Sequence, residues 1–567
     1  MSTLDWIVLF WTLISIAAFG IYKTRGKKNL DSYLRGNNSM NWWTIGLSIM
    51  ATQASAITFL STPGQAYEDG MRFIQFYFGL PIAMVIISAT FIPIYYKLKV
   101  YTAYEYLENR FDLKTRTLTA LLFIIQRGLG AGITIYAPAI ILSTLLGWNL
   151  TLTNILIGVL VILYTVSGGT EAVSITQKQQ MAVMMGGMIL AGIIVVQLLP
   201  ISFGEALHVA GKMEKLNVVS FEFDLADRYN VWSGMTAAVF LFLSYFGTDQ
   251  SQVQRYLSGQ TLTQSRMGLI MNGFLKIPMQ FIILFIGVMV FVFYQYIQPP
   301  VFFNKVQTEK IRSSEYAGEF EALEFQYETS FKEGRAAYQE MLAAIESEQD
   351  QKAEEIKGKI QDIKKEQSQI REEVKSLIVK NDPNAETRDT DYVFMRFVMD
   401  YLPPGIVGLL FAVIFSAAMS SSSSELNALG STTTIDLYKR SLKKEATDQH
   451  YLLSSKVFTA FWGLGAILFA TYASLFENLI QAVNLLGSLF YGTILGVFIV
   501  GFFLKWIRGN AVFIGALISQ ALILVVHFKN GEGILGYHWD IGFLWYNAIG
   551  CVAVMIFGTI AQIFLKK

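Results

Sequence analysis

The chain has 567 residues, of which 53% are hydrophobic and 15% charged, with a mean hydropathy of +0.43. Soluble domains are about 45–50% apolar and about 25% charged, so this composition excludes a soluble enzyme, a secreted disulfide scaffold and a disordered protein. A single cysteine, Cys551, cannot form an internal disulfide, and the four histidines lie too far apart to suggest a metal site. The formal net charge of +1 gives no reason to expect nucleic acid.

The apolar residues gather in runs of about 20 residues, the length that crosses a bilayer. We expect an all-α polytopic membrane protein with about thirteen transmembrane helices. The first run follows Asp5 rather than a basic segment and lacks a small-residue cleavage site, so we interpret it as a retained span. The expected limits are 4–23, 41–63, 71–97, 117–147, 151–168, 178–201, 232–256, 265–298, 403–436, 451–472, 478–504, 510–528 and 541–565.

Lysine and arginine residues fall in alternate loops between these spans. With thirteen crossings, one face receives Lys23, Arg25, Lys27, Lys28, Lys97, Lys99, Arg110, Lys114, Arg116, Lys178, Arg255, Arg266, Lys439, Arg440, Lys443, Lys444, Lys505, Arg508, Lys566 and Lys567. Cytoplasmic loops carry the excess of basic residues, so we expect the N-terminus outside and the C-terminus in the cytoplasm of a multi-pass cell-membrane protein.

Residues 303–392 interrupt the membrane pattern and divide the chain into spans 1–8 (1–302), an external insertion, and spans 9–13 (393–567). The insertion is rich in Glu, Lys and Gln, with Glu–Lys pairs at helical spacing. It predicts one or two long helices outside the membrane. They are either a solvated spacer or a docking surface for an external protein partner.

Several spans carry polar residues where lipid contact would be costly, and two of them suggest an ion site. The second span is small and polar from Ser48 to Thr58, and the ninth contains five consecutive serines, Ser420 to Ser424. A hard monovalent cation such as sodium needs several oxygen ligands but no carboxylate. Hydroxyls of one helix and free carbonyls of an unwound second helix would supply them, as in secondary transporters.

Several motifs resemble the sodium/solute symporter family, which includes sodium–sugar, sialic acid, proline, iodide and monocarboxylate cotransporters. They are the loop Ala103–Phe111, the glycine pair in Ser167-Gly168-Gly169, and a ninth-span signature from Leu402 to Lys439. The resemblance covers nearly the whole chain except 303–392. It implies a LeuT-like core of two inverted five-helix repeats, spans 2–6 and 7–11.

The resemblance also implies a sodium site between the second and ninth spans. Its ligands would be the carbonyls of Ala51, Ala54 and Ala417 and the hydroxyls of Ser420 and Ser421. Some relatives have a second sodium site, whose hydroxyl positions match Ser423 and Ser424, but its acidic ligand is Gln177 here. One sodium per solute is therefore favoured, unless Glu425 faces inward and compensates.

Positions matching the solute contacts of sugar and sialic acid relatives are Gln53, Thr58, Tyr77, Tyr245, Lys276 and, in the eleventh span, Gln481 or Asn484. Tyr245 would stack on the solute, and Lys276 either reaches the pocket or extends to the interface. Tyr77 replaces the acidic contact of sugar relatives. The segment Ile135–Ala139 resembles the iodide, vitamin and monocarboxylate branch, which favours a small organic anion or sugar acid.

Arg127 lies within an apolar span and needs an anionic partner. It is either a clamp for an anionic solute or part of an internal ion pair with Asp249 or Glu425. The overall prediction is sodium-coupled uptake of a sugar, sugar acid or monocarboxylate by alternating access, with Na⁺ as the coupling ion and no enzyme activity. The alternatives are a sodium-dependent sensor or partner-binding protein that uses the insertion, and a passive channel.

Overall fold

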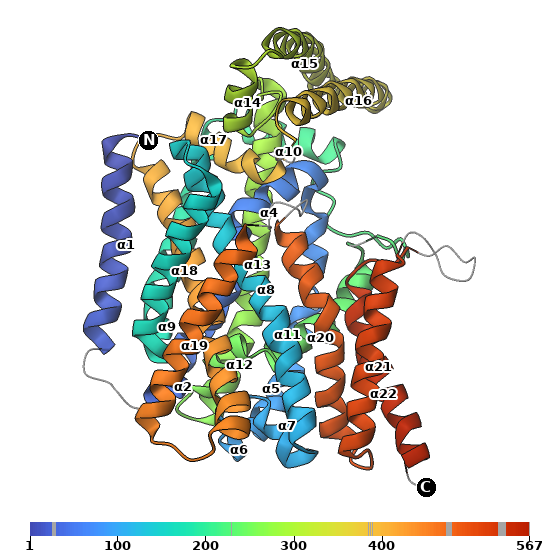
Figure 1. Ribbon diagram of the computed structural model, residues 1–567. Helices are drawn as coiled ribbons and strands as arrows, with labels where there is room; N and C mark the ends of the chain where they lie inside the picture. The colour runs from blue at the N-terminus through green and yellow to red at the C-terminus, as the bar shows by residue number, and fades with distance from the viewer. Residues whose placement is uncertain are drawn as a thin grey trace.

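The computed structural model describes residues 1–24, 30–227, 229–383, 385, 387, 389–471, 479–530 and 540–565. These residues form helices and connecting loops, with one isolated β-bridge between Met40 and Gly259. Figure 1 shows a bundle of membrane-length helices with a pair of long helices lying across its upper end. The N-terminus lies at that end and the C-terminus at the opposite end.

The part of the chain before the external insertion contains the helices α1 (Thr3–Thr24), α2 (Leu30–Arg35), η1 (Gly36–Asn38), α3 (Trp42–Gln53), α4 (Ala56–Asp69), η2 (Gly70–Tyr77), α5 (Leu80–Ala89), α6 (Phe91–Leu98), α7 (Glu105–Arg110), α8 (Leu113–Leu146), α9 (Leu150–Gln197), α10 (Phe203–Lys212), η3 (Ser233–Ala237), α11 (Ala238–Gly247), α12 (Gln250–Leu257) and α13 (Leu262–Tyr296). The rest contains α14 (Lys305–Arg312), α15 (Ala317–Glu346), α16 (Asp350–Asn381), η4 (Thr390–Tyr392), α17 (Val393–Tyr401), α18 (Ile406–Thr432), η5 (Thr433–Leu442), α19 (Asp448–Ala470), α20 (Leu479–Phe503), α21 (Gly509–Phe528) and α22 (Trp545–Leu565).

Ten described segments are long and apolar enough to cross a membrane. All thirteen expected spans fall on helices. Thirteen expected spans correspond to ten long segments because two spans are shorter helices and two others share one segment. Leu150–Leu163 and Ser233–Gly247 are shorter apolar helices, and the 43-residue segment Ala56–Leu98 contains parts of the second and third expected spans. The all-helical, multi-span prediction is confirmed.

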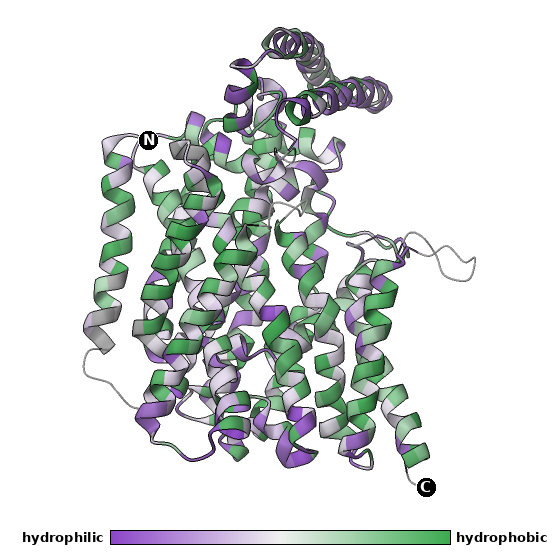
Figure 2. Ribbon diagram, in the orientation of Figure 1, coloured by the Kyte–Doolittle hydropathy of each residue, from purple (hydrophilic) through white to green (hydrophobic). Residues whose placement is uncertain are grey.

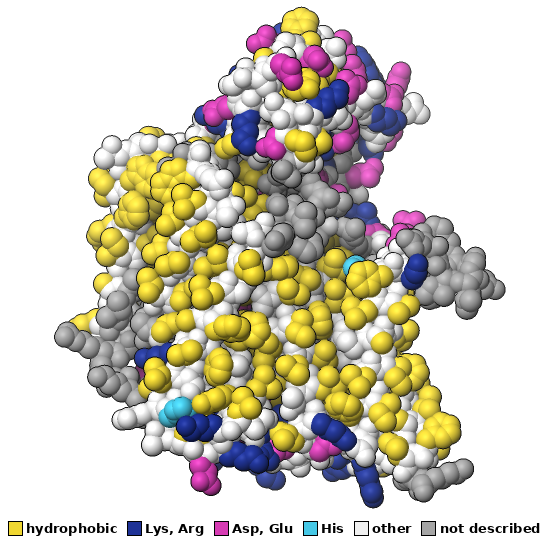
Figure 3. Space-filling view, in the orientation of Figure 1, with side chains coloured by type: hydrophobic (Ala, Val, Ile, Leu, Met, Phe, Trp, Pro, Cys, Tyr) yellow, Lys and Arg dark blue, Asp and Glu magenta, His cyan; other side chains and the backbone are white. Residues whose placement is uncertain are grey.

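The surface of the bundle agrees with this membrane arrangement. Apolar residues dominate the helices between two polar ends (Figure 2), and hydrophobic side chains cover the visible flank (Figure 3). Lysine and arginine side chains gather at the end away from the α15–α16 pair, which the positive-inside rule assigns to the cytoplasm. Of the basic residues behind that orientation, Arg25, Lys27, Lys28, Lys566 and Lys567 lie outside the described residues.

Helix α18 is the centre of the bundle. The segment that contains it is 83% buried, while the α1 segment is 24% buried. It packs against α1, α3, α4, α8, α9 and α19. The five serines of α18 therefore face protein on every side, which explains how so polar a stretch is accommodated within the membrane.

Glycine separates two of the expected spans inside one long helix. The 48-residue α9 contains both the fifth and the sixth span, and Gly169 interrupts it with φ 62° and ψ −177°. A side chain at this position would also lie 2.6 Å from the ring of Tyr33. Only glycine adopts this conformation at so close an approach, so the glycine pair of the sequence marks a required break.

The insertion contains two long helices, α15 and α16, which pack against each other as a hairpin, together with the short α14. Their facing sides form a separate apolar cluster around Phe320, Tyr327 and Val374. Salt bridges of Lys212 with Asp350 (3.0 Å) and of Lys357 with Glu214 (2.7 Å) join the hairpin to the segment after α9.

Candidate sodium and solute site

The second expected span is unwound at its middle. Helix α3 ends at Gln53 and α4 begins at Ala56, and Ala54 (φ −79°, ψ 77°) and Ser55 (φ −75°, ψ 171°) between them are not helical. The N–H of Ser55 donates to the carbonyl of Gln53 (3.0 Å), so it does not continue the helical bond to Ala51. The Ala51 carbonyl is thereby released from the helical ladder, in a segment buried in protein.

The serines of α18 lie against this break. The Ser420 hydroxyl donates to the Ala51 carbonyl (2.9 Å), and the Ser421 hydroxyl donates to the carbonyl of Ala417 (2.9 Å) within its own helix. Ser420, Ser421 and Ala54 are all buried. Because α18 packs against both α3 and α4, the Ser420–Ala51 hydrogen bond joins the unwound span to α18, while Ser421 and Ala417 contact each other within α18.

The donor set at this crossing consists of neutral oxygens. Hydroxyl groups both donate and accept, so the protons of Ser420 and Ser421 can rotate off the carbonyls and leave oxygen lone pairs for a hard cation. Among the described residues, no group of three or more His, Cys, Asp or Glu is arranged to hold a metal ion. The chemistry of the crossing therefore suits a weakly held monovalent ion rather than a resident divalent one.

Gln177 occupies the adjoining hydroxyl cluster. Its amide nitrogen donates to the hydroxyls of Ser420 (2.9 Å), Ser424 (3.0 Å) and Thr52 (3.0 Å), and its amide oxygen accepts from Ser48. An N–H donor thus occupies hydroxyl lone pairs at the positions expected for a second sodium site. The Ser423 hydroxyl instead donates to the Ser420 carbonyl (3.1 Å).

Arg127 forms a buried ion-pair network. Its Nη1 donates to Glu425 (3.0 Å), and its Nη2 contacts Asp249 and the Tyr491 hydroxyl (2.6 Å), which also donates to Asp249 (3.1 Å). Of the two interpretations left open by the sequence, the internal ion pair is present, and with both acidic candidates. Glu425 is engaged there rather than in the Gln177 cluster.

The position of Asp249 reveals a break that sequence reasoning missed. Helix α11 ends at Gly247, and Asp249 caps α12 by accepting from the N–H of Ser251 (2.9 Å). The seventh span is therefore interrupted, like the second, and these are the first spans of the two expected repeats. The sequence Gly247-Thr248-Asp249, a helix stop followed by an N-cap residue, is the signal that could have revealed it.

A central cavity of about 80 Å³ lies beside the unwound stretch at Ala54 and Ser55. Six of the expected solute contacts line it, namely Gln53, Thr58, Tyr77, Arg127, Tyr245 and Asn484. The aromatic rings of Phe76 and Phe242 complete one wall, packed 5.0 Å apart between centroids. The Gln53 side-chain oxygen is buried without a hydrogen-bond partner among the described groups.

Two expected contacts lie elsewhere. Lys276 is buried behind Tyr77, with Nζ 5.7 Å from the ring centroid and no hydrogen-bond partner among the described groups. Gln481 lies one turn outward of Asn484 and lines a different, outer cavity, where its amide donates to Gln65 (3.2 Å). Asn484, rather than Gln481, is therefore the eleventh-span residue at the central cavity.

Comparisons with known proteins agree with this fold. A model of the sodium:solute symporter family matches residues 33–318 and 379–520. The sodium/sialic acid symporter SiaT of Proteus mirabilis is 26% identical over 98% of this chain and 94% of its own length. The sodium-coupled monocarboxylate transporter 1 of Xenopus laevis is 27% identical over 92% of this chain and 71% of its own length.

A solved structure supports the fold. It is the substrate-bound outward-open state of a Na⁺-coupled sialic acid symporter, which superposes with a TM-score of 0.76 and 24% identity over 99% of this chain and 98% of that one. The two stretches matched by the family model leave out residues 319–378, which hold most of the α15–α16 hairpin.

Proposed function

We propose that this chain, which belongs to the sodium:solute symporter family and is a sodium-coupled multi-pass membrane transporter, carries a small organic monoanion together with one sodium ion. The proposal extends the shared family function to a solute class and a stoichiometry. The observation that carries it is the contact between Ser420 and the released carbonyl of Ala51, directly beside the central cavity.

The sodium site we propose uses the carbonyls of Ala51, Ala54 and Ala417 and the hydroxyls of Ser420 and Ser421. Sodium bound there would tie the broken second span to α18, and so favour one arrangement of the two helices over the other. Solute affinity and sodium affinity then depend on the same geometry, which is the origin of coupling.

The charges around the cavity support a monoanion. Arg127, which lines the cavity, pairs with the buried Asp249 and Glu425, and Lys276, buried behind Tyr77 outside the cavity lining, supplies a further positive charge when protonated. One sodium ion leaves a single positive charge that a monoanionic solute would neutralise. Binding the sodium ion and an anion together keeps this buried region neutral. A neutral region has the lowest electrostatic free-energy cost at low dielectric.

The size of the cavity supports a small solute. Its volume of about 80 Å³ lies well below the ~300–1,000 Å³ of sites for drug-sized ligands. A short monocarboxylate therefore fits this conformation better than a nine-carbon sugar acid. Gln53, whose oxygen lacks a partner among the described groups, is the proposed acceptor for a hydroxyl on the solute.

We assign the Arg127 network to the cytoplasmic gate. Tyr491 lies two turns further toward the cytoplasmic end of α20 than Asn484, so the ion pairs lie between the cavity and the cytoplasm. The aromatic ring of Tyr245, with the Arg127 guanidinium 5.3 Å from its centroid, joins the same barrier. Release inward requires these contacts to separate after sodium and solute have bound from outside.

Uptake into proteoliposomes tests the proposal. An inward sodium gradient should drive accumulation of labelled lactate or pyruvate, and choline in place of sodium should abolish it. N-acetylneuraminate and glucose serve as the sugar-acid and neutral-sugar comparisons. Sodium-driven uptake of N-acetylneuraminate but not of the short acids would refute the small-monoanion assignment, and equal uptake without sodium would refute the coupling.

A second role, docking of an external protein on the α15–α16 hairpin, stays a prediction. The side of α15 and α16 that lines the shallow outer groove from Phe325 to Glu373 carries an exposed Phe325 among charged residues.

A further inference from the structure

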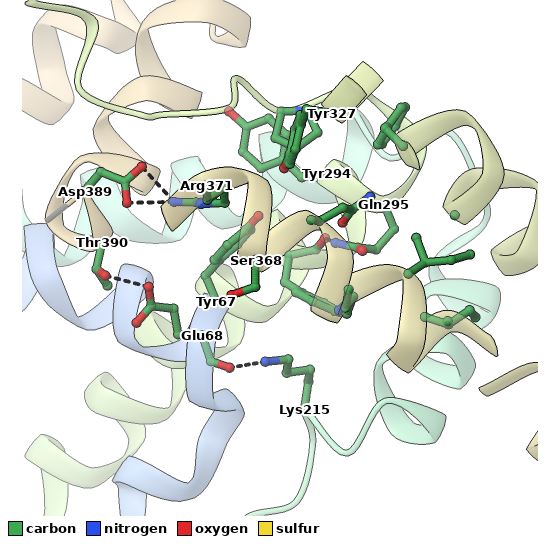
Figure 4. A pocket seen from close by; sticks show the side chains of 18 of the residues that line it. Tyr67, Glu68, Lys215, Tyr294, Gln295, Tyr327, Ser368, Arg371, Asp389 and Thr390 are labelled. Carbon is green, nitrogen blue, oxygen red and sulfur yellow. Dashed lines mark hydrogen bonds and ion pairs between the residues drawn. The ribbon is translucent and has the colours of Figure 1, made fainter. Parts of the chain in front are cut away.

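A second, larger cavity lies between the external hairpin and the membrane bundle. Its volume is about 620 Å³, and its walls come from the outer end of α4, the outer end of α13, the facing sides of α15 and α16, and the start of α20. Figure 4 shows Tyr67, Tyr294 and Tyr327 around this space, with Lys215 and Arg371 at its edges. The hairpin therefore covers the external side of the bundle at this cavity.

Two lysines in this cavity make cation–π contacts with the same aromatic ring, that of Phe291. Lys364 of α16 has its Nζ 4.1 Å from the centroid of the Phe291 ring and 5.9 Å from that of Tyr338. Lys215, from the segment after α10, has its Nζ 4.8 Å from the same Phe291 centroid. Burial, reinforced by the charge of Lys215, holds the pKa of Lys364 well below its usual value.

Several of the other charged groups of the cavity already have partners, among them Asp69, which accepts a hydrogen bond from Gln65. Arg371 forms two hydrogen bonds with Asp389 (2.7 and 2.8 Å), and Lys375 pairs with Glu372 (2.7 Å). Thr390 donates to the Glu68 side chain (2.6 Å), while Lys215 donates to the Glu68 backbone carbonyl. Lys364 forms an ion pair with none of the described carboxylates.

A partly buried ammonium group beside a second one is unfavourable without a counter-ion. Cation–π contacts with Phe291 and Tyr338 offset part of this cost, but they do not neutralise the charge. A carboxylate between the two ammonium groups would form charge-assisted hydrogen bonds with both. The neighbouring rings would cover an apolar body attached to it.

We propose that this outer cavity is a second ligand site, which binds an organic carboxylate with an apolar or aromatic body between Lys364 and Lys215 on the faces of Phe291 and Tyr338. The site is built by a hairpin that lies largely outside the residues matched by the family model. Its floor contains the Gln481–Gln65 hydrogen bond, one turn of α20 above Asn484 of the central cavity. A carboxylate bound here would lie on the external side of the central cavity.

The site needs no sodium, which separates its test from that of the proposed function. Binding of labelled benzoate to the purified full chain should be saturable in choline chloride without sodium, at about one molecule per chain. Neutral benzamide should compete poorly. Lys364→Met should raise the Kd for benzoate at least about tenfold, and Lys364→Arg should keep it within about threefold.

The matched control is Lys365→Met, because Lys365 is the next residue of α16 and its side chain is 79% exposed. It should leave the Kd unchanged. Lys215→Met provides a second route to the same loss should Lys364→Met destabilise the hairpin. No saturable sodium-free binding, equal binding of benzamide, or unchanged binding in both Lys364→Met and Lys215→Met would overturn the proposal. Failure of sodium-driven uptake alone would overturn only the proposed function.

Discussion

The hydroxyl of Ser420 donates a hydrogen bond to the carbonyl oxygen of Ala51, 2.9 Å away, at the point where the second membrane span unwinds. These two residues lie 369 positions apart in the chain and on different expected repeats. Their contact joins the unwound span to α18, which belongs to the most buried of the candidate membrane segments. A cation inserted between them would control how the repeats rock against each other.

Loss of one hydroxyl at this crossing should weaken sodium binding selectively. We expect Ser421→Ala to raise the sodium concentration for half-maximal uptake about tenfold, with a smaller effect on the solute KM at saturating sodium. Ser422→Ala is the control, because Ser422 is equally buried on the same helix and its hydroxyl has no partner among the described groups. An identical shift in both variants would show that the crossing is not the sodium site.

A carboxylate at position 177 should create a second cation site. In Gln177→Asp, the amide donor that now holds Thr52, Ser420 and Ser424 is lost, and the new negative charge lies among three hydroxyls. We expect the Hill coefficient for sodium in uptake assays to rise from about one toward two. Gln177→Asn shortens the side chain without adding a charge, so the Hill coefficient should stay near one. A wild-type coefficient already near two would contradict the role given to Gln177.

Transport by the wild-type protein should be electroneutral. One sodium with one monoanion moves no net charge, so a membrane potential set by potassium and valinomycin should not change the accumulation ratio. Each net charge would contribute about 2.3 kcal/mol per 100 mV, so the alternative stoichiometry of two sodium ions is easily distinguished. Accumulation that follows the potential would refute the one-to-one ratio.

The Arg127 network should contribute to stability as a unit. Arg127→Met leaves Asp249 and Glu425 buried without their counter-ion, and we expect a loss of about 3–5 kcal/mol. The double variant Arg127→Met/Glu425→Gln should recover part of that loss, because one of the two carboxylates is removed as well. Thermal unfolding of the purified variants measures both effects. Additive losses would show that the two residues are not coupled.

Carboxylate binding in the outer cavity should weaken as pH rises. Burial and Lys215 lower the pKa of Lys364 below its usual value, so Lys364 loses its proton at a lower pH than a free lysine. The protonated form binds the carboxylate, so benzoate affinity is highest at low pH and falls as the pH passes the lowered pKa. Titrations between about pH 6 and pH 9 measure this. Lys364→Arg should reduce the dependence, since arginine stays charged, and the remainder comes from Lys215, whose pKa burial also lowers.

The sequence predicted the membrane architecture well because span length and charge asymmetry are local properties. The runs of apolar residues correspond to helices, and the glycine pair at Gly169 corresponds to a break inside α9. The polar stretch from Ser48 to Thr58 indicated an unwound helix, which is present at Ala54–Ser55. The break before Asp249 was missed, since its residues also suit the end of a span.

Local sequence patterns did not predict which side chains pair across the bundle. Arg127 required an anion, but two carboxylates on different spans were equally good candidates until packing brought both within reach. Gln481 and Asn484 differ by three positions, and only the tilt and rotation of α20 assign one to the outer cavity and the other to the central one.

The sequence by itself determined that this chain crosses a membrane many times, which end carries the basic residues, and which helix holds its hydroxyls, because hydrophobic burial and helix period act over short stretches. The tertiary structure alone decided that Gln177 fills the hydroxyl cluster, that Arg127 is paired on both sides, and that the hairpin encloses an outer cavity. These features depend on atoms from distant segments meeting within hydrogen-bond distance, which a single sequence does not encode in any local pattern.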